Sequence, residues 1–412
     1  MAKEEKKAPK LRFNGYTNDW ERKKLGDIVE FYSGLTYKPE NIAQSGTLVI
    51  RSSNIHNSKY VNADNVYVKN NIVNSEYVKK QDIVVVVRNG SRNLIGKHAL
   101  LTSIPHNPSV IGAFMTGIRS SDNQFIETLL NTEQFKREIN KNLGATINQI
   151  TTSQFKKMRF HVSKQKENKQ IGVLFTYLDN SINLHERKCE ELTLIKKSLL
   201  QKLFPKEDKI KPEIRYKNFS DAWEQRKLGD ISKTKRGLTY KPSNIDNTGI
   251  RVLRSSNIKE DTFVISDNDV FVKESAVNIP FVKNGDILIT AANGSTNLVG
   301  KHAIIRDIPK NSAVHGGFML ITTSKEYEFL NASMSSNWYK KFIKKYVAGG
   351  NGAIGNLRKN DLDNQKIYVP KKDEQEKIGN FFKMLDSLIT LHQRKLEKLK
   401  QLKKFLLQNM FI

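Results

Sequence analysis

The chain consists of two copies of one sequence unit, and this duplication limits the possible folds more than any other feature. The repeated segments keep the same order in both copies and lie about 203 or 204 residues apart. These segments are WERKKLGDI at 20–28 and WEQRKLGDI at 223–231, GLTYKP at 34–39 and 237–242, RSSNI at 51–55 and 254–258, GSRNLIGKHA at 90–99 and GSTNLVGKHA at 294–303, and GAFM at 112–115 and GGFM at 316–319. Two copies are too few for a solenoid, which needs at least about three. We therefore expect two similar domains.

Each copy ends in a long segment with helical periodicity. QIGVLFTYLDNSINLHERK at 170–188 aligns with KIGNFFKMLDSLITLHQRK at 377–395. Apolar residues recur every three or four positions without an internal proline, which predicts two amphipathic helices of about 35 residues, roughly 50 Å long. Each helix needs a partner for its apolar stripe, so we expect an antiparallel, coiled-coil-like pair. The predicted packing positions are Leu178, Ile182, His185 and Leu192 in the first helix and Leu385, His392 and Leu399 in the second.

The segments before these helices combine strand and helix patterns. Short apolar runs such as Asp82–Val87 and Asp286–Thr290 are typical of buried strands, whereas Asn123–Asn140 and Tyr327–Tyr346 favour helices. We expect an α+β chain with two similar mixed α/β domains, separated by two long antiparallel helices and related by a pseudo-twofold axis. The predicted boundaries are 1–164 for the first domain, 165–205 for the central helix, 206–371 for the second domain and 372–412 for the distal helix.

The charge of the chain indicates a polyanionic partner. Sixty-nine Lys and Arg residues against forty-two Asp and Glu residues give a net charge of +27. Such an excess repels itself unless an anion neutralises it, and nucleic acid is the usual anion because binding releases its condensed counterions. A basic but solvated surface is the alternative. The single cysteine, Cys189, excludes an intramolecular disulfide, and no apolar run approaches the roughly 20 residues of a membrane span. We therefore expect a cytoplasmic protein.

Catalytic motifs are not found in the sequence. The Gly-Lys pair at 96–97 suggests a phosphate-binding loop, but five residues separate Gly90 from Gly96 where a Walker A motif has four. A histidine also replaces the required Ser or Thr after Lys97 and Lys301. The sequence has no tetrapeptide typical of base methylation, no dinucleotide-binding fingerprint and no histidines at metal-ligand spacing. We expect no catalytic residue, no metal and no cofactor.

The organisation of the chain resembles that of the DNA-specificity (S) subunit of type I restriction-modification systems. The resemblance covers nearly the whole chain and rests on the repeated opening motif, GLTYKP, RSSNI, the NGS…NLxGKHA segment and LD…LH…RK in each helix. It implies two target recognition domains, each reading one half of a bipartite, gapped site in double-stranded DNA, and no catalytic residues. By the same resemblance the helices set the gap and dock two methyltransferase (M) subunits, and endonuclease/translocase (R) subunits complete the complex.

The two copies together suggest which residues contact DNA. Residues shared by both copies cannot distinguish two different half-sites, so they are candidates for phosphate contacts or scaffold. Residues that differ are candidates for base readout, and arginine suits guanine. The shared candidates are Arg51 and Arg254, Asn54 and Asn257, Lys97 and Lys301, and His98 and His302. The candidates for readout are Arg88 and Arg92, the latter replaced by Thr296, with Asn148, Gln149, Asn356 and Arg358 in the loops at 142–154 and 347–361.

The helix length predicts a separation between the half-sites. A rigid rod of roughly 50 Å corresponds to about 15 base pairs at about 3.4 Å each. The segments at 3–13 and 206–216 also align, which predicts a nearly circular arrangement with two equivalent docking faces. Two alternatives remain open at this point. The chain could be a nonspecific nucleic-acid-binding adapter, or it could be a self-contained enzyme that modifies DNA.

Overall fold

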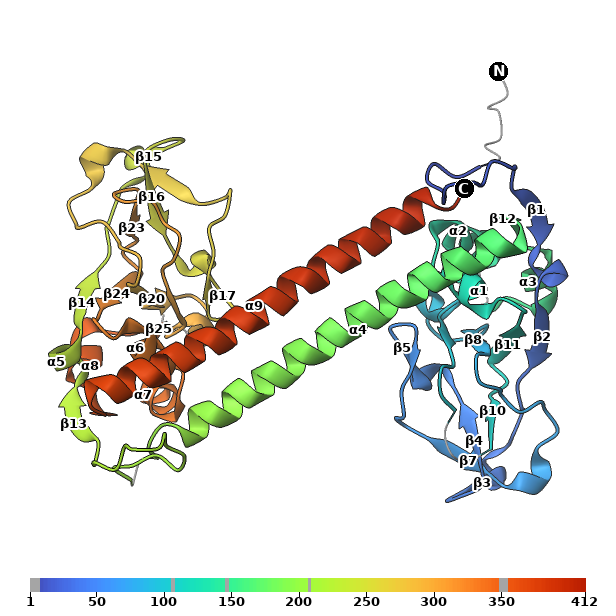
Figure 1. The fold of residues 1–412 in the computed structure, drawn as a ribbon, viewed down its shortest axis with the longest axis horizontal. Helices are drawn as coiled ribbons and strands as arrows, with labels where there is room; N and C mark the ends of the chain where they lie inside the picture. The colour runs from blue at the N-terminus through green and yellow to red at the C-terminus, as the bar shows by residue number, and fades with distance from the viewer. Residues whose placement is uncertain (1–7, 105–107, 145–147, 207–208, 348–354) are drawn as a thin grey trace. The chain divides into compact units, whose positions relative to one another are not determined.

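The computed structural model describes residues 8–104, 108–144, 148–206, 209–347 and 355–412. The chain forms two compact units, each with a globular domain and part of both long helices (Figure 1). Unit 1 comprises Met1–Glu186 with Arg394–Ile412, and unit 2 comprises Arg187–Gln393. Unit 1 combines residues from both ends of the chain, and unit 2 includes the end of the first long helix, so neither unit corresponds to one sequence repeat alone.

The domain of unit 1 is built on two four-stranded sheets. The first has the order β2-β11-β8-β9 and is antiparallel, with the fully buried run IVVV in its interior strand β8. The second has the order β10-β4-β7-β3, with β10 and β4 parallel. The continuous apolar run of β8 is typical of a strand with both faces covered. The strands are β2 (Glu30–Ser33), β3 (Ile42–Ala43), β4 (Thr47–Ile50), β7 (Val66–Val68), β8 (Ile83–Val86), β9 (His98–Leu100), β10 (Ser109–Ile111) and β11 (Met115–Arg119).

Unit 2 has the same two sheets with the same strand order. They are β14-β24-β20-β22 and β15-β19-β16-β23, again with one parallel pair, between β16 and β23. The duplicated sequence therefore folds into two copies of one domain, as predicted. The strands are β14 (Lys233–Arg236), β15 (Ile245–Asp246), β16 (Ile250–Leu253), β19 (Val270–Val272), β20 (Ile287–Thr290), β22 (His302–Ile304), β23 (Ala313–His315) and β24 (Met319–Thr323).

Smaller elements complete each domain. The two-stranded sheets are β1 (Glu21–Lys24) with β12 (Arg159–Val162), β5 (Ile55–His56) with β6 (Lys59–Tyr60), β13 (Glu224–Lys227) with β26 (Lys366–Val369), β17 (Ile258–Lys259) with β18 (Thr262–Phe263), and β21 (Ala292–Asn293) with β25 (Gly355–Asn356). The short α-helices beside these sheets are α3 (Thr152–Lys157), α5 (Leu228–Ile231) and α8 (Lys359–Asn364). The 3-10 turns are η1 (Leu25–Asp27), η2 (Pro39–Asn41), η3 (Ser52–Asn54), η4 (Asn70–Ile72), η5 (Arg92–Leu94), η6 (Pro242–Asn244), η7 (Ser255–Asn257), η8 (Glu274–Ala276) and η9 (Thr296–Leu298).

The structure corrects the prediction of one helix over Asn123–Asn140. The segment forms two helices, α1 (Asn123–Leu130) and α2 (Glu133–Asn142), because Thr132 caps the second. Its hydroxyl oxygen accepts a hydrogen bond from the Phe135 backbone N–H, and such local bonds compete with a continuous helix. The second copy divides in the same way, into α6 (Tyr327–Met334) and α7 (Asn337–Val347).

The two long helices are α4 (Gln165–Lys202) and α9 (Lys372–Asn409), each of 38 residues. The two helices pair antiparallel, as predicted, and equivalent ion pairs join them in each unit. Lys403 of α9 lies 2.5 Å from Asp179 of α4 in unit 1, and Lys196 of α4 lies 2.5 Å from Asp386 of α9 in unit 2. Of the predicted packing residues, Leu178, Ile182 and Leu385 are buried, and Leu192 and Leu399 pack partly buried against the domain cores. His185 and His392 are half-exposed.

The end of each long helix completes the core of the domain in the other repeat. In unit 1 the ring of Phe411, just after α9, lies edge-on to Trp20 with the centroids 5.9 Å apart. In unit 2 the ring of Phe204, just after α4, makes the same contact with Trp223 at 6.0 Å. Aromatic pairs at this distance and angle are favourable beyond the area that they bury. The two sequence repeats therefore depend on each other for complete cores.

Backbone hydrogen bonds hold the segment that leads into each domain against the end of the long helix from the other repeat. The Leu11 N–H donates to the Asn409 carbonyl at the end of α9, and the Ile214 N–H donates to the Lys202 carbonyl at the end of α4. The next residue in each segment is an arginine, which forms a double hydrogen bond to a buried glutamate at the start of a long helix. These pairs are Arg12 with Glu167 and Arg215 with Glu374.

Candidate nucleic-acid interface

Four repeated motifs that lie far apart in the sequence meet at one open hollow of about 560 Å³ in unit 2. Among the described residues that line it, none is acidic and one, Arg254, is basic. The lining comes from GLTYKP (Leu238, Thr239, Tyr240, Pro242) and the following Ile245, from RSSNI (Arg254, Ser255), from the NGS segment (Ala292, Asn293, Gly294) and from GGFM (Gly316, Gly317, Phe318, Met319). The motifs are thus parts of one surface.

Close backbone contacts hold these motifs together. The Leu238 N–H donates to the His315 carbonyl at 2.7 Å, and a Cβ on Gly237 would lie 2.0 Å from the Gly316 carbonyl oxygen. Only glycine permits this approach. The side-chain amide of Asn293 donates to the Ser255 hydroxyl at 3.1 Å. The hollow is therefore fixed by the main chain and by short polar side chains.

Unit 1 has the same contacts between the same motifs. The Leu35 N–H donates to the Ile111 carbonyl at 2.7 Å, and the Asn89 amide donates to Ser52 at 3.2 Å. At the positions that line the hollow, the two units differ only where Arg88 corresponds to Ala292 and Ala113 to Gly317. The Arg88 guanidinium lies over the Phe114 ring, 5.0 Å from its centroid.

The predicted readers of unit 1 lie at the rim of this surface. Arg88 forms a β-bridge with Gln149, and the Asn148 side chain donates to the Gly90 carbonyl at 3.0 Å. Arg92 donates to the Gly144 carbonyl at 3.2 Å. The two divergent stretches, separate in sequence, are therefore neighbours in the fold. Residues 145–147 of the predicted loop lie outside the described residues.

The predicted readers of unit 2 lie at the corresponding rim. Strand β25 pairs Asn356 with Ala292, and Thr296 begins η9 beside it. Arg358 and Asn356 are exposed, and Arg358 precedes α8. Residues 348–354, which include most of the glycine-rich NGAIG segment, lie outside the described residues. The rim thus carries different side chains in the two units on a common backbone arrangement.

The shared basic candidates remain accessible. Arg51 is half-exposed and donates to the Asp64 carbonyl at 2.6 Å, while its counterpart Arg254 lines the hollow. Lys97 is half-exposed with its ammonium 3.4 Å from the Ser52 carbonyl, and Lys301 is exposed. Long cationic side chains of this kind can reach phosphates beside a base-reading surface.

The structure corrects the expectation for the shared asparagines. Asn54 and Asn257 are fully buried. The Asn54 side-chain oxygen Oδ1 accepts a hydrogen bond from the Arg51 backbone N–H at 2.9 Å, and the side-chain Nδ2 group donates to the Ala63 carbonyl at 2.6 Å. Buried amides with satisfied partners stabilise a loop and are not available to a ligand. These asparagines therefore belong to the scaffold of the RSSNI turn, and burial excludes phosphate contact, the other role that the sequence left open for them.

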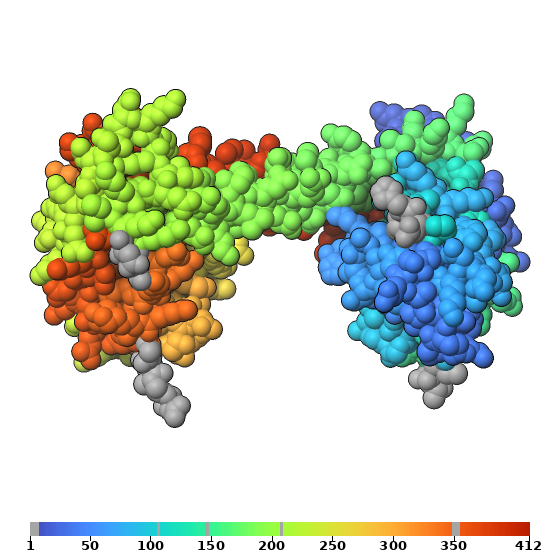
Figure 2. Space-filling model, turned by 90° about the horizontal axis from the view of Figure 1, so that it is seen from below, coloured from blue at the N-terminus to red at the C-terminus, as the bar shows by residue number. Residues whose placement is uncertain are grey.

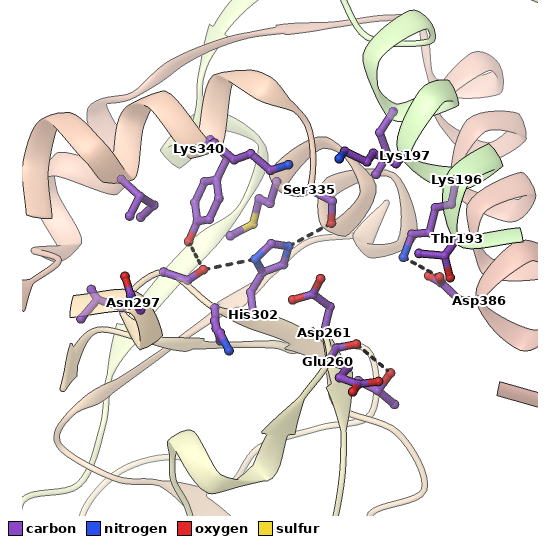
Figure 3. A pocket seen from close by; sticks show the side chains of 18 of the residues that line it. Thr193, Lys196, Lys197, Glu260, Asp261, Asn297, His302, Ser335, Lys340 and Asp386 are labelled. Atoms are coloured by element: carbon purple, nitrogen blue, oxygen red, sulfur yellow. Dashed lines mark hydrogen bonds and ion pairs between the residues drawn. The ribbon is translucent and has the colours of Figure 1, made fainter. Parts of the chain in front are cut away.

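The shared histidines are also buried and take internal roles in place of DNA contact. The Nδ1 atom of His98 lies 2.8 Å from the Gly96 carbonyl, and its Nε2 atom lies 3.6 Å from the Glu127 carboxylate. The corresponding Nε2 atom of His302 lies 3.3 Å from the Ser335 hydroxyl, toward which the ring points in Figure 3. Burial lowers the pKa of His302, so its ring is neutral at pH 7.

Within the described ranges, no cluster of three or more His, Cys, Asp or Glu side chains has an arrangement that could bind a metal ion. In that same part of the chain, no helix is both long enough and apolar enough to span a membrane.

Comparison with known proteins places the chain in a family. Residues 17–194 and 220–401 each match the type I restriction modification DNA specificity domain. The matches cover most of the chain, so the chain belongs to this family, and the resemblance seen in the sequence is confirmed. The duplicated domain with two long helices is thus the architecture of a type I DNA-specificity protein.

Individual relatives agree with this assignment. The chain is 25% identical over 378 residues to the type I restriction enzyme EcoKI specificity subunit of Escherichia coli K12, covering 87% of this chain and 80% of that one. It is 23% identical over 407 residues to the MjaVIII specificity subunit of Methanocaldococcus jannaschii, covering 94% and 90%. The crystal structure of a type I restriction-modification S subunit from M. genitalium has the same fold, with a TM-score of 0.65, 16% identity and coverage of 98% and 99%.

Proposed function

We propose that this chain is the non-catalytic specificity subunit of a type I restriction-modification complex and that each unit reads one half of a bipartite, gapped DNA site. One observation carries the proposal. The same motif-lined surface occurs in both units, with different side chains at its rim. A common surface suits the common shape of duplex DNA, and a variable rim suits two different base sequences. The net charge of +27 supports a polyanionic ligand.

The rim side chains favour different bases in the two half-sites. Arg88 and Arg92 of unit 1 carry the planar guanidinium that pairs with the O6 and N7 atoms of guanine. The equivalent residues in unit 2 are Ala292 and Thr296, which cannot make that contact. Unit 1 should therefore read a guanine at a position where unit 2 does not. Asn148, Gln149, Asn356 and Arg358 supply further polar groups at the two rims, and Arg51, Lys97, Arg254 and Lys301 supply cations for phosphates.

The outer faces of the long helices support docking of two M subunits, and R subunits complete the complex. Tyr177 and Leu184 of α4 are exposed, and Met384 and Leu391 are exposed at the equivalent positions of α9. Figure 2 shows the surface of α4, in green, open over much of its length. Apolar side chains that recur on a solvent-exposed helix face are typical of protein interfaces. One such face on each helix provides two equivalent docking surfaces.

A binding selection tests the proposed specificity. The full chain, assembled with its M subunit, is mixed with random duplexes, and the bound duplexes are sequenced. We expect two short conserved blocks around a gap of fixed length. Arg92→Thr should relax one guanine in one block and leave the other block unchanged, and Thr296→Arg should change only the other block. Recovery of random sequences would instead support the nonspecific adapter.

The enzyme alternative needs a separate measurement. The purified chain alone, incubated with DNA and a radiolabelled methyl donor, should transfer no label. Clear methylation by the chain alone would overturn the non-catalytic assignment.

A further inference from the structure

The hollow in unit 2 is bordered by an aromatic side chain that is not part of the domain core. The Phe318 side chain of GGFM is 73% exposed, and the equivalent Phe114 of GAFM is 53% exposed. The next residue in each motif, Met319 or Met115, is buried. A phenyl ring this exposed adds little to the folded core, so its repeated position suggests a ligand.

The backbone holds the Phe318 ring at a defined place. The Phe318 carbonyl accepts hydrogen bonds from the N–H groups of Ala291 and Ala292, at 2.9 and 3.0 Å. The turn follows β23, which pairs in parallel with β16, and leads directly into β24, one of the two interior strands of its sheet. A side chain projected from such a support is preorganised and loses little entropy when it meets a ligand.

The two units differ in what lies against the ring. In unit 1 the Arg88 guanidinium covers one face of Phe114, whereas Ala292 leaves the equivalent face of Phe318 open. The open space in unit 2 is the hollow of about 560 Å³, within the size range of pockets that hold small planar groups. Its lining includes Tyr240 and Pro242 and no acidic residue among those described. These properties suit a nucleobase better than a protein side chain of positive charge.

We infer that Phe318 stacks on a base of the half-site read by unit 2, at a base step that opens to admit the ring, and that the hollow receives the displaced edge of that base. Phe114 has a different role, because its ring holds the Arg88 guanidinium in place for a guanine. The inference rests on the proposed function. Apolar wedges open base steps in other protein–DNA complexes, and stacking on an aromatic ring tolerates any base. The two domains therefore deform their half-sites to different extents.

The test uses the full chain assembled with its M subunits and the duplex sequence recovered in the binding selection. 2-Aminopurine, whose fluorescence increases when it loses a stacked neighbour, replaces one base at a time through both half-sites. Besides any increase at the base that an M subunit flips, we expect an increase at one further step of the unit 2 half-site and at no further step of the unit 1 half-site. Phe318→Ala should abolish this increase and weaken binding about tenfold, and Phe318→Tyr should retain both.

Exchange of the neighbouring residue provides the matched control. Ala292→Arg should place a guanidinium over the Phe318 ring and remove the fluorescence increase, while Arg88→Ala should create an increase in the unit 1 half-site. An unchanged increase in Phe318→Ala, or full affinity without this further increase in the wild type, would overturn the inference. A loss of M-subunit binding by Phe318→Ala without DNA would overturn it in favour of a protein contact. Failure of the selection to recover any sequence would instead count against the proposed function.

Discussion

At the scale of single residues, equivalent positions in the two units carry different chemistry on the same backbone. His315 is buried at the end of β23 in unit 2, where unit 1 has the buried Ile111 at the end of β10. The Nε2 atom of His315 lies 3.3 Å from the Lys235 carbonyl. Burial lowers the pKa of His315 to about 4, because the charged ring would lose its solvation. This difference gives unit 2 a pH dependence that unit 1 lacks at this position.

Replacement of His315 by isoleucine, the residue at the equivalent position of unit 1, should make the free energy of unfolding of unit 2 less dependent on acid pH. The unfolded chain binds a proton near pH 6.5 and the folded chain only near pH 4, so stability is full above about 6.5 and falls as the pH decreases toward about 4. The loss at this single site is roughly 3 kcal/mol by the linkage relation. Urea unfolding followed between pH 4 and pH 7 should give a flatter profile for His315→Ile than for the wild type. Parallel profiles would show that the pKa of His315 is the same in the folded and the unfolded chain, so that burial does not lower it.

At the scale of elements, the long helices both build the cores and present outer faces. The inner residues Leu178 and Leu385 are buried, and the helix ends bring Phe204 and Phe411 into the two domain cores. Periodicity alone predicted the helices and most of their buried positions, because an amphipathic stripe is a local pattern. It did not indicate which helix end completes which domain, since each contact joins a residue of one sequence repeat to a residue of the other.

The outer helix faces lead to a prediction about stoichiometry. Leu184→Glu on α4 and Leu391→Glu on α9 each place a charge on an exposed apolar face. Burial of an unpaired charge at an interface is costly, so each variant should lose one M subunit, and the double variant should lose both. Mass measurement of the assembled complex should show this stepwise loss. Ile265→Glu, which changes a similarly exposed residue outside the helices, should retain full assembly. Full assembly of the double variant would place the docking surface elsewhere.

At the scale of the whole molecule, α4 and α9 each run through both compact units. A helix of 38 residues is about 57 Å long at about 1.5 Å per residue. We propose that this length determines the gap in the DNA site. Its effect can be separated from base readout because the helices carry none of the candidate readers.

Lengthening both helices together should widen the gap. Four residues inserted after Glu186 in α4 and four after Gln393 in α9 add about one turn, or roughly 6 Å, at the boundary between the units. At about 3.4 Å per base pair, the gap recovered in the binding selection should grow by about two base pairs, with both half-sites unchanged. The same insertion after Asn247, in an exposed turn, is the control and should leave the gap as it is. An unchanged gap in the double insertion would refute the role of the helices as a ruler.

The candidate interface was only partly predictable from the sequence. Comparison of the two copies identified Arg88 and Arg92 as differing residues, and the structure places both at the rim. The same comparison could not separate the accessible Arg51 from the buried Asn54 in one motif, because burial depends on residues outside the motif, such as Ala63, whose carbonyl accepts the Asn54 amide. The exposure of Phe318 could not be predicted from the sequence either, since a phenylalanine between glycine and methionine is typical of a core.

The sequence by itself determined the duplication, the two domains, the long helices and the family, because these features are carried by local patterns that occur twice. Only the tertiary structure decided that GLTYKP, RSSNI, the NGS segment and GxFM form one surface, and that each helix end belongs to the core of the other repeat. The physical reason is that hydrophobic burial and close backbone approach act between residues that are neighbours in space. Periodicity and motif spacing depend only on the order of residues along the chain.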